Sequence, residues 1–526
     1  MVKVRYCKIE SFEFCNTFLK SILSAYYINS MEKLFEIINF DSEIIQLMNQ
    51  IAPFRSQWSD NFIHRSLSLI KNIQLVKPVI NMIDYDIINI KSLNYDFNQF
   101  NHFHTFTNIF QNYHHHKHTI NHYLNQEQSN IIKDIFDTGL INSADNYYYL
   151  LFHLPFNQQL TQLINTIISN NLPSDFPPIY FKILSNNFIP AIIYDWIISN
   201  NYLLTNINIE ITCQNCLVPT NLIILHSMDL LSTGIDLILE TISNNLCSLL
   251  NLYKINNSEQ LNIIYIPTPF HKKINNFKIN CTINRLLISK LKNILSLSYN
   301  YTHFSNPISN LTVNGGSTKK GFNSNYITIW RSEEFSKVLI HELIHYYELE
   351  KGDYFDLISF TKLNISNNYP HYSKEFFTEL QTWFVYTIIN LSLINYQFNA
   401  NDLRFILNYE RLYSLFNIIK IFQHYDIQDI DHFLSNNPKY MINIHSSVLY
   451  YYILKGLFLF NVNPFVEFLM WPYQLYQIDK SRVSNITSQQ LNKTMNCQQM
   501  KIFVNKILKI KPILNDSMTM MNLKYH

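Results

Sequence analysis

The chain has 526 residues, a formal net charge of +2, and only 15% charged residues against 47% hydrophobic residues. A nearly neutral chain without a long run of Lys or Arg lacks the basic face of a nucleic-acid binder, so we expect no nucleic-acid partner. The length exceeds that of one ordinary core and predicts several domains.

The cysteines and the apolar segments indicate the compartment. Seven cysteines are dispersed through the chain, a pattern that argues against a disulfide framework and for a reducing environment. The N-terminus lacks the apolar core of a signal peptide. The most apolar stretch, Val448 to Phe460, is shorter than the roughly 20 residues of a membrane span and is predicted to form a buried helix. We therefore expect an intracellular, cytoplasmic protein without a membrane span, and nothing in the sequence indicates its oligomeric state.

The first part of the chain, residues 1–205, has apolar residues at mixed spacings of three and four, which predicts an N-terminal helical region. Seven histidines lie between His102 and His122 without acidic residues among them. They are interpreted as a low-complexity surface rather than a metal site. Cys213 and Cys216 have no second cysteine pair nearby to complete a four-ligand zinc site, so ordinary packing is expected there.

The pattern changes after residue 206, where short β-like runs alternate with helical stretches. After residue 400 the pattern is helical again. The predicted fold class is therefore α+β and predominantly helical, with a central domain at 206–400 and a C-terminal helical region at 401–526. The predicted central elements are strands at 208–212, 261–266 and 326–330 and helices at 235–252 and 284–297.

The sequence His341-Glu342-Leu343-Ile344-His345 carries the candidate chemistry. Residues four apart on a helix share a face, so His341 and His345 can present nitrogens to one ion. Glu342 lies about 100° around the helix from His341, so it can reach a metal-bound water without ligating the metal. Zinc lowers the pKa of such a water toward about 7, and a carboxylate takes the proton during attack. The motif predicts one Zn²⁺ per chain, with Glu342 as general base; the alternative is two core histidines beside an incidental Glu.

The motif is predicted to lie on a helix of about five turns at 3.6 residues each. Ser332 is the expected N-cap, and Glu333 and Glu334 would occupy the first turn, where the helix dipole favours acidic groups. Gly352 is the expected C-terminal stop.

A catalytic zinc needs a third protein ligand. Glu375 is the first candidate because it starts another predicted helix beyond the motif. Glu379 lies one turn later on the same face, where it can accept a hydrogen bond from a ligand imidazole. The main alternative makes Glu379 the ligand and leaves Glu375 exposed. His371 and Asp353 are weaker options.

These residues carry a family resemblance. A His-Glu-x-x-His motif followed by a separate helix bearing Glu resembles gluzincin metallopeptidases, and Glu375-Phe376-Phe377-Thr378-Glu379 resembles the third-ligand helix of the anthrax lethal-factor type. The resemblance implies a zincin-like central domain with a small twisted sheet and an active-site helix. It also implies that His341, His345 and Glu375 bind zinc and that Glu342 is the base. Residues 313–318 and 329–334 resemble metallopeptidases predicted for large DNA viruses, which would place the protein in host cytoplasm or in a virion.

Further roles follow from the expected chemistry. Tyr326 to Trp330 is positioned like the edge strand that aligns a peptide substrate. Tyr369, Tyr372 or His371 could donate to the oxyanion of the tetrahedral intermediate. The leading hypothesis is a zinc-dependent peptidase with a peptide or protein substrate. The alternative is a catalytically inert scaffold or interaction protein that keeps zinc for stability, and a third possibility is hydrolysis of a non-peptide substrate.

Overall fold

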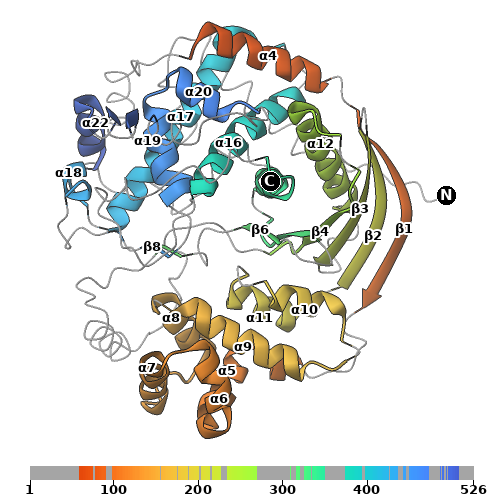
Figure 1. Cartoon of the computed structure of the whole chain (residues 1–526), viewed down its shortest axis with the longest axis vertical. Helices are drawn as coiled ribbons and strands as arrows, with labels where there is room; N and C mark the ends of the chain where they lie inside the picture. The colour runs from red at the N-terminus through yellow and green to blue at the C-terminus, as the bar shows by residue number, and fades with distance from the viewer. Residues whose placement is uncertain are drawn as a thin grey trace.

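The computed structural model describes, with short interruptions, residues 58–268, 308–349, 373–472 and 486–508. These residues form a mixed α+β architecture in which helices pack against a curved sheet whose strand β1 lies at the edge of the molecule in Figure 1. The predicted α+β class is confirmed at this level. The predicted helix at 284–297 lies outside the described residues.

The main sheet has six strands in the order β1-β2-β3-β4-β7-β6. Neighbouring strands are antiparallel except for the parallel pairs β3/β4 and β4/β7. The strands are β1 (Val79–Asn89), β2 (Leu203–Cys213), β3 (Cys216–His226), β4 (Leu261–Tyr265), β6 (Gly316–Lys319) and β7 (Tyr326–Ile329). The three predicted strands are confirmed as parts of β2, β4 and β7. β1, β3 and β6 were not predicted, and β1 lies in the region predicted to be helical.

The sheet separates two hydrophobic cores because successive side chains of a strand point to opposite faces. In β2, Ile207 and Ile209 belong to one core and Leu204 to the other. Tyr326 and Trp330 also face the second core. The position of a functional side chain therefore depends on which face of the sheet it lies on as well as on its strand.

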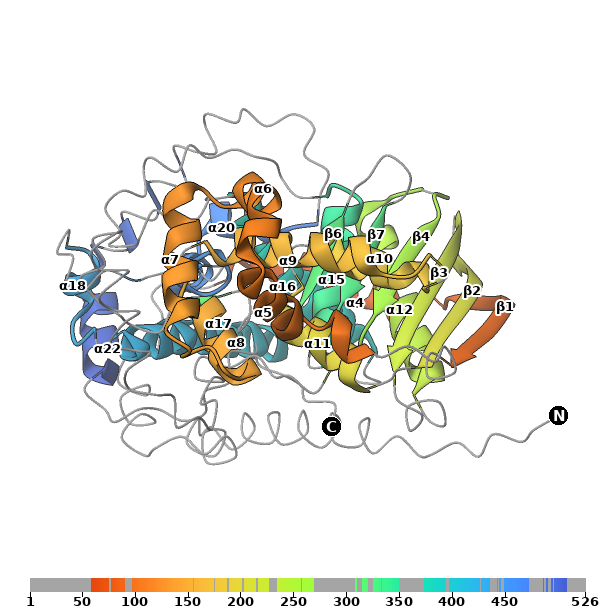
Figure 2. The same ribbon diagram turned by 90° about the horizontal axis from the view of Figure 1, so that it is seen from below.

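The second core is formed with the helices from α5 to α11. In Figure 1 α10 and α11 lie beneath β6 and the neighbouring strands, and Figure 2 shows them in front when the molecule is viewed from below. These helices are α5 (His102–Gln111), α6 (Tyr113–Tyr123), α7 (Gln126–Asp137), α8 (Ala144–His153), α9 (Asn157–Asn171), α10 (Pro178–Leu184) and α11 (Ala191–Asn200).

The first core joins the other face of the sheet to helices from both ends of the described chain. These are α4 (Asp60–Gln74), α12 (Ile235–Tyr253), α15 (Phe335–Tyr346), α16 (Ser373–Leu393), α17 (Ala400–His424), α18 (Ile430–Phe433), the π-helix η6 (Leu449–Leu454), α19 (Lys455–Phe460), α20 (Pro464–Met470) and α22 (Gln498–Leu508). Smaller elements are η2 (Phe97–Phe100) and the pair β5 (Ile308–Ser309) and β8 (Ile444–His445). The C-terminal helices thus share a core with the motif helix α15, while the domain limits at 205/206 and 400/401 stay predictions.

The apolar stretch near the C-terminus is helical and buried in its described part, as predicted. It forms η6 and α19, and every residue from Lys455 to Phe460 is buried. Within the described ranges, no helix combines the length and apolarity needed to cross a membrane.

One interpretation of the sequence is corrected. Cys213 at the end of β2 forms a disulfide with Cys247 of α12, whereas the sequence predicts only ordinary packing at Cys213. Spacing along the chain does not reveal this pairing, because the fold brings a strand end beside the middle of a helix. The histidine-rich segment forms α5 and α6, and most of its histidines are exposed, as expected for a surface, whereas His102 is buried.

Candidate metal centre

The motif helix α15 begins later and ends earlier than the sequence suggests. It spans 12 residues, and Glu334, with a left-handed φ of 59°, occupies the N-cap position. The prediction of Ser332 as N-cap is wrong, because its hydroxyl donates a hydrogen bond to the carbonyl oxygen of Thr268, at 3.2 Å. The helix is thus shorter than the expected five turns. Gly352, the predicted stop, lies outside the described residues.

The apolar residues of the motif helix fix its orientation. Leu339, Ile340, Leu343 and Ile344 are completely buried in the first core. The helix contacts α12 and α16 on its sides, and β6 and β7 beneath it. Because these apolar residues are buried, the polar side chains of the motif are directed toward α16 and β6.

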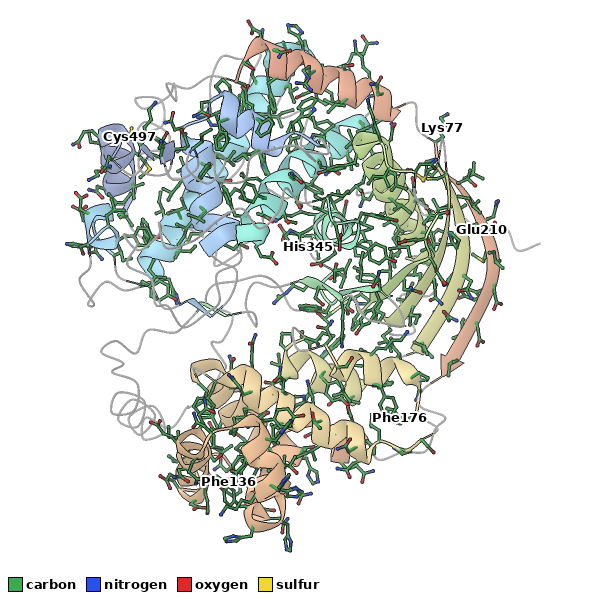
Figure 3. The ribbon with its side chains drawn as sticks, in the orientation of Figure 1. Lys77, Phe136, Phe176, Glu210, His345 and Cys497 are labelled. Carbon is green, nitrogen blue, oxygen red and sulfur yellow. A yellow bond between two sulfur atoms is a disulfide. The ribbon has the colours of Figure 1, made fainter. Side chains whose placement is uncertain are left out.

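Three side chains converge between α15 and α16. His341 Nε2 lies 3.2 Å from His345 Nε2. Glu375 Oε2, from the first turn of α16, lies 3.4 Å from His341 Nε2 and 3.6 Å from His345 Nε2. Figure 3 shows the labelled His345 in the interior between α16 and the sheet. The three residues form a group that could hold a metal ion.

The separations within this group fit a common metal ligand sphere. Donor atoms about 2.0–2.1 Å from a tetrahedral ion lie roughly 3.4 Å from one another. The three measured separations are 3.2, 3.4 and 3.6 Å. An ion could therefore be accepted with small side-chain adjustments, since each donor already faces the same point.

The charges of these groups are coupled. Burial opposes ionisation of Glu375, but the adjacent His345 and His341 outweigh it and hold the pKa of Glu375 well below its usual range. Burial would lower the pKa of His341, but hydrogen bonds to Glu375 and Glu379 raise it above its ordinary value. His341 must lose any proton that it carries before it can bind a metal ion, so metal binding should release protons.

Glu379 lies on the far side of the His341 ring. Its Oε2 is 3.5 Å from His341 Nδ1, while its Oε1 accepts hydrogen bonds from Lys337 Nζ at 2.8 Å and Lys455 Nζ at 3.0 Å. Burial opposes ionisation, yet the two ammonium groups hold the pKa of Glu379 well below its usual range. The fold therefore places Glu375 among the three converging donors and Glu379 behind one of them.

Glu342 is not a member of the donor group, and its carboxylate contacts the sheet. Its Oε2 accepts a hydrogen bond from Thr318 Oγ1 of β6 at 2.8 Å. β6 can come this close because Gly316 has no side chain: a Cβ there would lie 2.6 Å from Val338 Cγ1 and 3.1 Å from Glu342 Oε1. Burial raises the pKa of Glu342, against the opposing effect of His341 and His345.

The strand beside Glu342 differs from the predicted one. β7, which contains most of Tyr326 to Trp330, lies between β4 and β6 and is not an edge strand. β6 ends the sheet at this side among the described residues, and it contacts α15. The prediction of Tyr326 to Trp330 as the edge strand is therefore wrong, because β6 pairs antiparallel with β7 on its outer side.

Other predicted residues cannot be placed at the site. Tyr369, Tyr372, His371 and Asp353 lie outside the described residues. The sequence reasoning missed Thr318, Lys337 and Lys455. Lys337 could have been found from the sequence, because it lies one turn before His341 on the same predicted helix. Lys455 could not, because it lies far from the motif along the chain.

Comparisons with protein-family models, curated proteins and solved structures gave no match. The interpretation of this centre therefore depends on the motif and on the geometry of its side chains.

Proposed function

We propose that the protein is a zinc-dependent hydrolase of peptide bonds in which Glu342 is the general base. One observation carries the proposal: His341, His345 and Glu375 direct donor atoms at a common point, while Glu342 of the same motif is held apart from them. This separation of ligands from base is what water activation requires.

The donor set supports zinc as the ion. Two imidazole nitrogens and one carboxylate oxygen form a ligand set of catalytic zinc sites, in which a fourth position stays open for water or substrate. Within the described residues, the group that could hold a metal ion consists of three protein ligands, His341, His345 and Glu375. A structural zinc site would be closed by a fourth protein ligand. We therefore assign one Zn²⁺ per chain.

The chemistry divides between the ion and the chain. Zinc, when bound, lowers the pKa of a water molecule and polarises a carbonyl oxygen. The Glu342 carboxylate accepts a proton from the attacking water and later donates it to the leaving amine. Its raised pKa suits both roles, because a base whose pKa lies nearer the working pH can also return the proton. Thr318 holds Oε2, so we assign proton transfer to Oε1.

A peptide is the proposed substrate because of the strand beside Glu342. An extended peptide can add to an exposed strand edge through main-chain hydrogen bonds, and β6 is the last strand of the sheet next to the site within the described ranges. Pairing along β6 would bring successive peptide groups past Glu342. Tyr369 and Tyr372 stay proposals as oxyanion donors, and an intracellular, cytoplasmic location and a viral origin stay predictions from the sequence.

The decisive experiment compares the wild type with Glu342→Gln. Protein purified without chelators is analysed for metal, and both forms are incubated with a proteome-derived peptide library. We expect about one zinc per chain in both forms, and new cleavage products from the wild type only. Equal amounts of zinc with identical, uncleaved libraries would favour the inert scaffold. Absence of metal from the wild type would overturn the proposal.

A further inference from the structure

A second charged cluster lies behind the metal centre and is made by three different helices. Glu379 of α16 accepts hydrogen bonds on one oxygen, Oε1, from Lys337 of α15 and Lys455 of α19. All three side chains are buried, with side-chain exposures of 3%, 6% and 1%. The other oxygen of Glu379 lies beside His341 Nδ1. A continuous line of contacts thus joins Lys455 to a candidate metal ligand.

The buried position of Lys455 is unfavourable for a charged side chain. Lys455 interrupts a buried apolar stretch of η6 and α19 in which the neighbouring side chains belong to the first core. Burying an ammonium group costs several kcal/mol of desolvation in order-of-magnitude terms, and an apolar residue of similar volume is often more stabilising. Packing alone therefore does not account for a lysine here.

The surrounding structure fixes where Lys455 points. The next residue, Gly456, allows α19 to approach α17 closely, since a Cβ there would lie 2.5 Å from Ile418 Cδ1. At the other end of α19, buried Arg411 donates hydrogen bonds to the carbonyl oxygens of Leu459 at 2.6 Å and Phe460 at 2.9 Å. One face of α19 is thus held against α17, and Lys455 projects toward α16.

We propose that Lys455 is a positioning residue of the metal centre, acting together with Lys337 to hold the Glu379 carboxylate against His341. The inference rests on the proposed function, because it concerns the same metal. Partners behind a metal-binding histidine fix its ring orientation and its tautomer. A carboxylate held by two ammonium groups cannot turn away from the imidazole without leaving buried charges unpaired. The C-terminal helices therefore complete the metal centre.

The test measures metal affinity rather than activity. Apparent zinc dissociation constants are obtained by chelator competition for the wild type, Lys455→Met and Lys455→Arg. The visible spectrum of the cobalt-substituted protein reports the geometry at the ion. We expect Lys455→Met to lower the affinity for zinc about tenfold, which is the lower end of the usual range for groups that hold a metal ligand in place. We also expect it to change the cobalt spectrum. Lys455→Arg should stay within about threefold of the wild type, because it keeps the charge.

Lys501→Met is the matched control, since Lys501 lies in the same C-terminal region but pairs with Asp431 near the surface. It should bind zinc as the wild type does. Circular dichroism checks the fold of each variant. If Lys455→Met does not fold, Lys337→Met decides, because Lys337 contacts the same oxygen of Glu379.

Three results would overturn the inference. The first is a folded Lys455→Met variant that binds zinc as tightly as the wild type, or the same result for Lys337→Met if Lys455→Met does not fold. It would show that the cluster does not support the metal centre. An equal loss in Lys455→Arg and Lys455→Met would assign Lys455 to packing instead of charge. Failure of the wild type itself to bind zinc would overturn the proposed function and the inference with it, whereas zinc binding that ignores the lysines overturns only the inference.

Discussion

Thr318 of the edge strand β6 donates its hydroxyl hydrogen bond to the carboxylate of Glu342 on α15, with 2.8 Å between Oγ1 and Oε2. The same hydroxyl lies 2.9 Å from the carbonyl oxygen of Glu342. One side chain therefore links the strand proposed to align the substrate with the residue proposed to act as base. The register between strand and base is set by a contact outside the motif.

Thr318→Val should lower kcat with little change in KM or zinc content. Valine keeps the shape of threonine but removes the hydroxyl, and losing a hydrogen bond to a charged group costs about 1.5–3 kcal/mol, or roughly ten- to hundredfold in rate. Steady-state kinetics on a peptide cleaved by the wild type gives the measurement. Thr318→Ser is the matched control and should recover most of the rate. A Thr318→Val enzyme as fast as the wild type would show that Glu342 needs no such support.

Glu342→Gln should separate binding from chemistry. Glutamine has nearly the same size but cannot accept the proton of water, so hydrolysis should fall by at least about a hundredfold, as expected for loss of a general base. Zinc content should stay at the wild-type level, because Glu342 is not among the three converging donors. Elemental analysis and peptide cleavage are run on the same preparation. Loss of zinc to the extent seen in His345→Ala would contradict the role of Glu342.

Glu375→Gln and Glu379→Gln form a matched pair that tests the third ligand. Glu375 Oε2 lies within 3.6 Å of both Nε2 atoms, whereas Glu379 Oε2 lies beside the other ring nitrogen of His341, Nδ1. Glu375→Gln should therefore leave an incomplete site that loses zinc during dialysis. Glu379→Gln should keep measurable zinc with an affinity about 10–100-fold lower. The reverse order of affinities, measured by chelator competition, would make Glu379 the ligand.

The sequence could predict the parts of the site that lie within one helix. The spacing of His341 and His345 depends only on helical geometry, and the helix that carries Glu375 and Glu379 is visible from its apolar periodicity. The position of Lys455 could not be predicted, because it depends on how α19 packs against α16 and α17. The structure was also needed to see which of Glu375 and Glu379 lies with the two histidine Nε2 atoms, since two acids one turn apart share a face.

The sheet shows the same limit. β2 has a regular alternation of Ile with polar residues and was predicted, because one face is buried. β3 was missed because Pro219 and Asn221 interrupt its apolar run, and β1 because its apolar residues also fit helical spacing. Both become strands through pairing with β2, a partner that local sequence does not reveal.

The last prediction concerns Asp195 of α11, a buried carboxylate in the group of helices from α5 to α11. Its Oδ1 accepts a hydrogen bond from the backbone N–H of His102 at 2.7 Å, at the start of α5. Tyr148 donates its hydroxyl to the other oxygen. Burial raises the pKa of Asp195 to about 7. Between pH 4 and 7 the folded protein thus keeps a proton that the unfolded chain has released, so this group makes the free energy of unfolding fall as pH rises.

Asp195→Asn should remove this dependence, because the amide is uncharged at every pH and can still accept from the backbone. Urea unfolding at pH 5 and pH 8 gives the free energy for both forms. We expect the stability of the wild type relative to Asp195→Asn to fall between these values by a few kcal/mol, since one pKa unit corresponds to about 1.4 kcal/mol. Burial lowers the pKa of His102 to about 3, which acts in the opposite direction, but His102 is present in both forms and its effect cancels in the difference. Asp137→Asn, an exposed partner of Lys133, should show no such change relative to the wild type. Equal pH dependence in the wild type and Asp195→Asn would mean that Asp195 ionises in the folded protein as readily as in the unfolded chain.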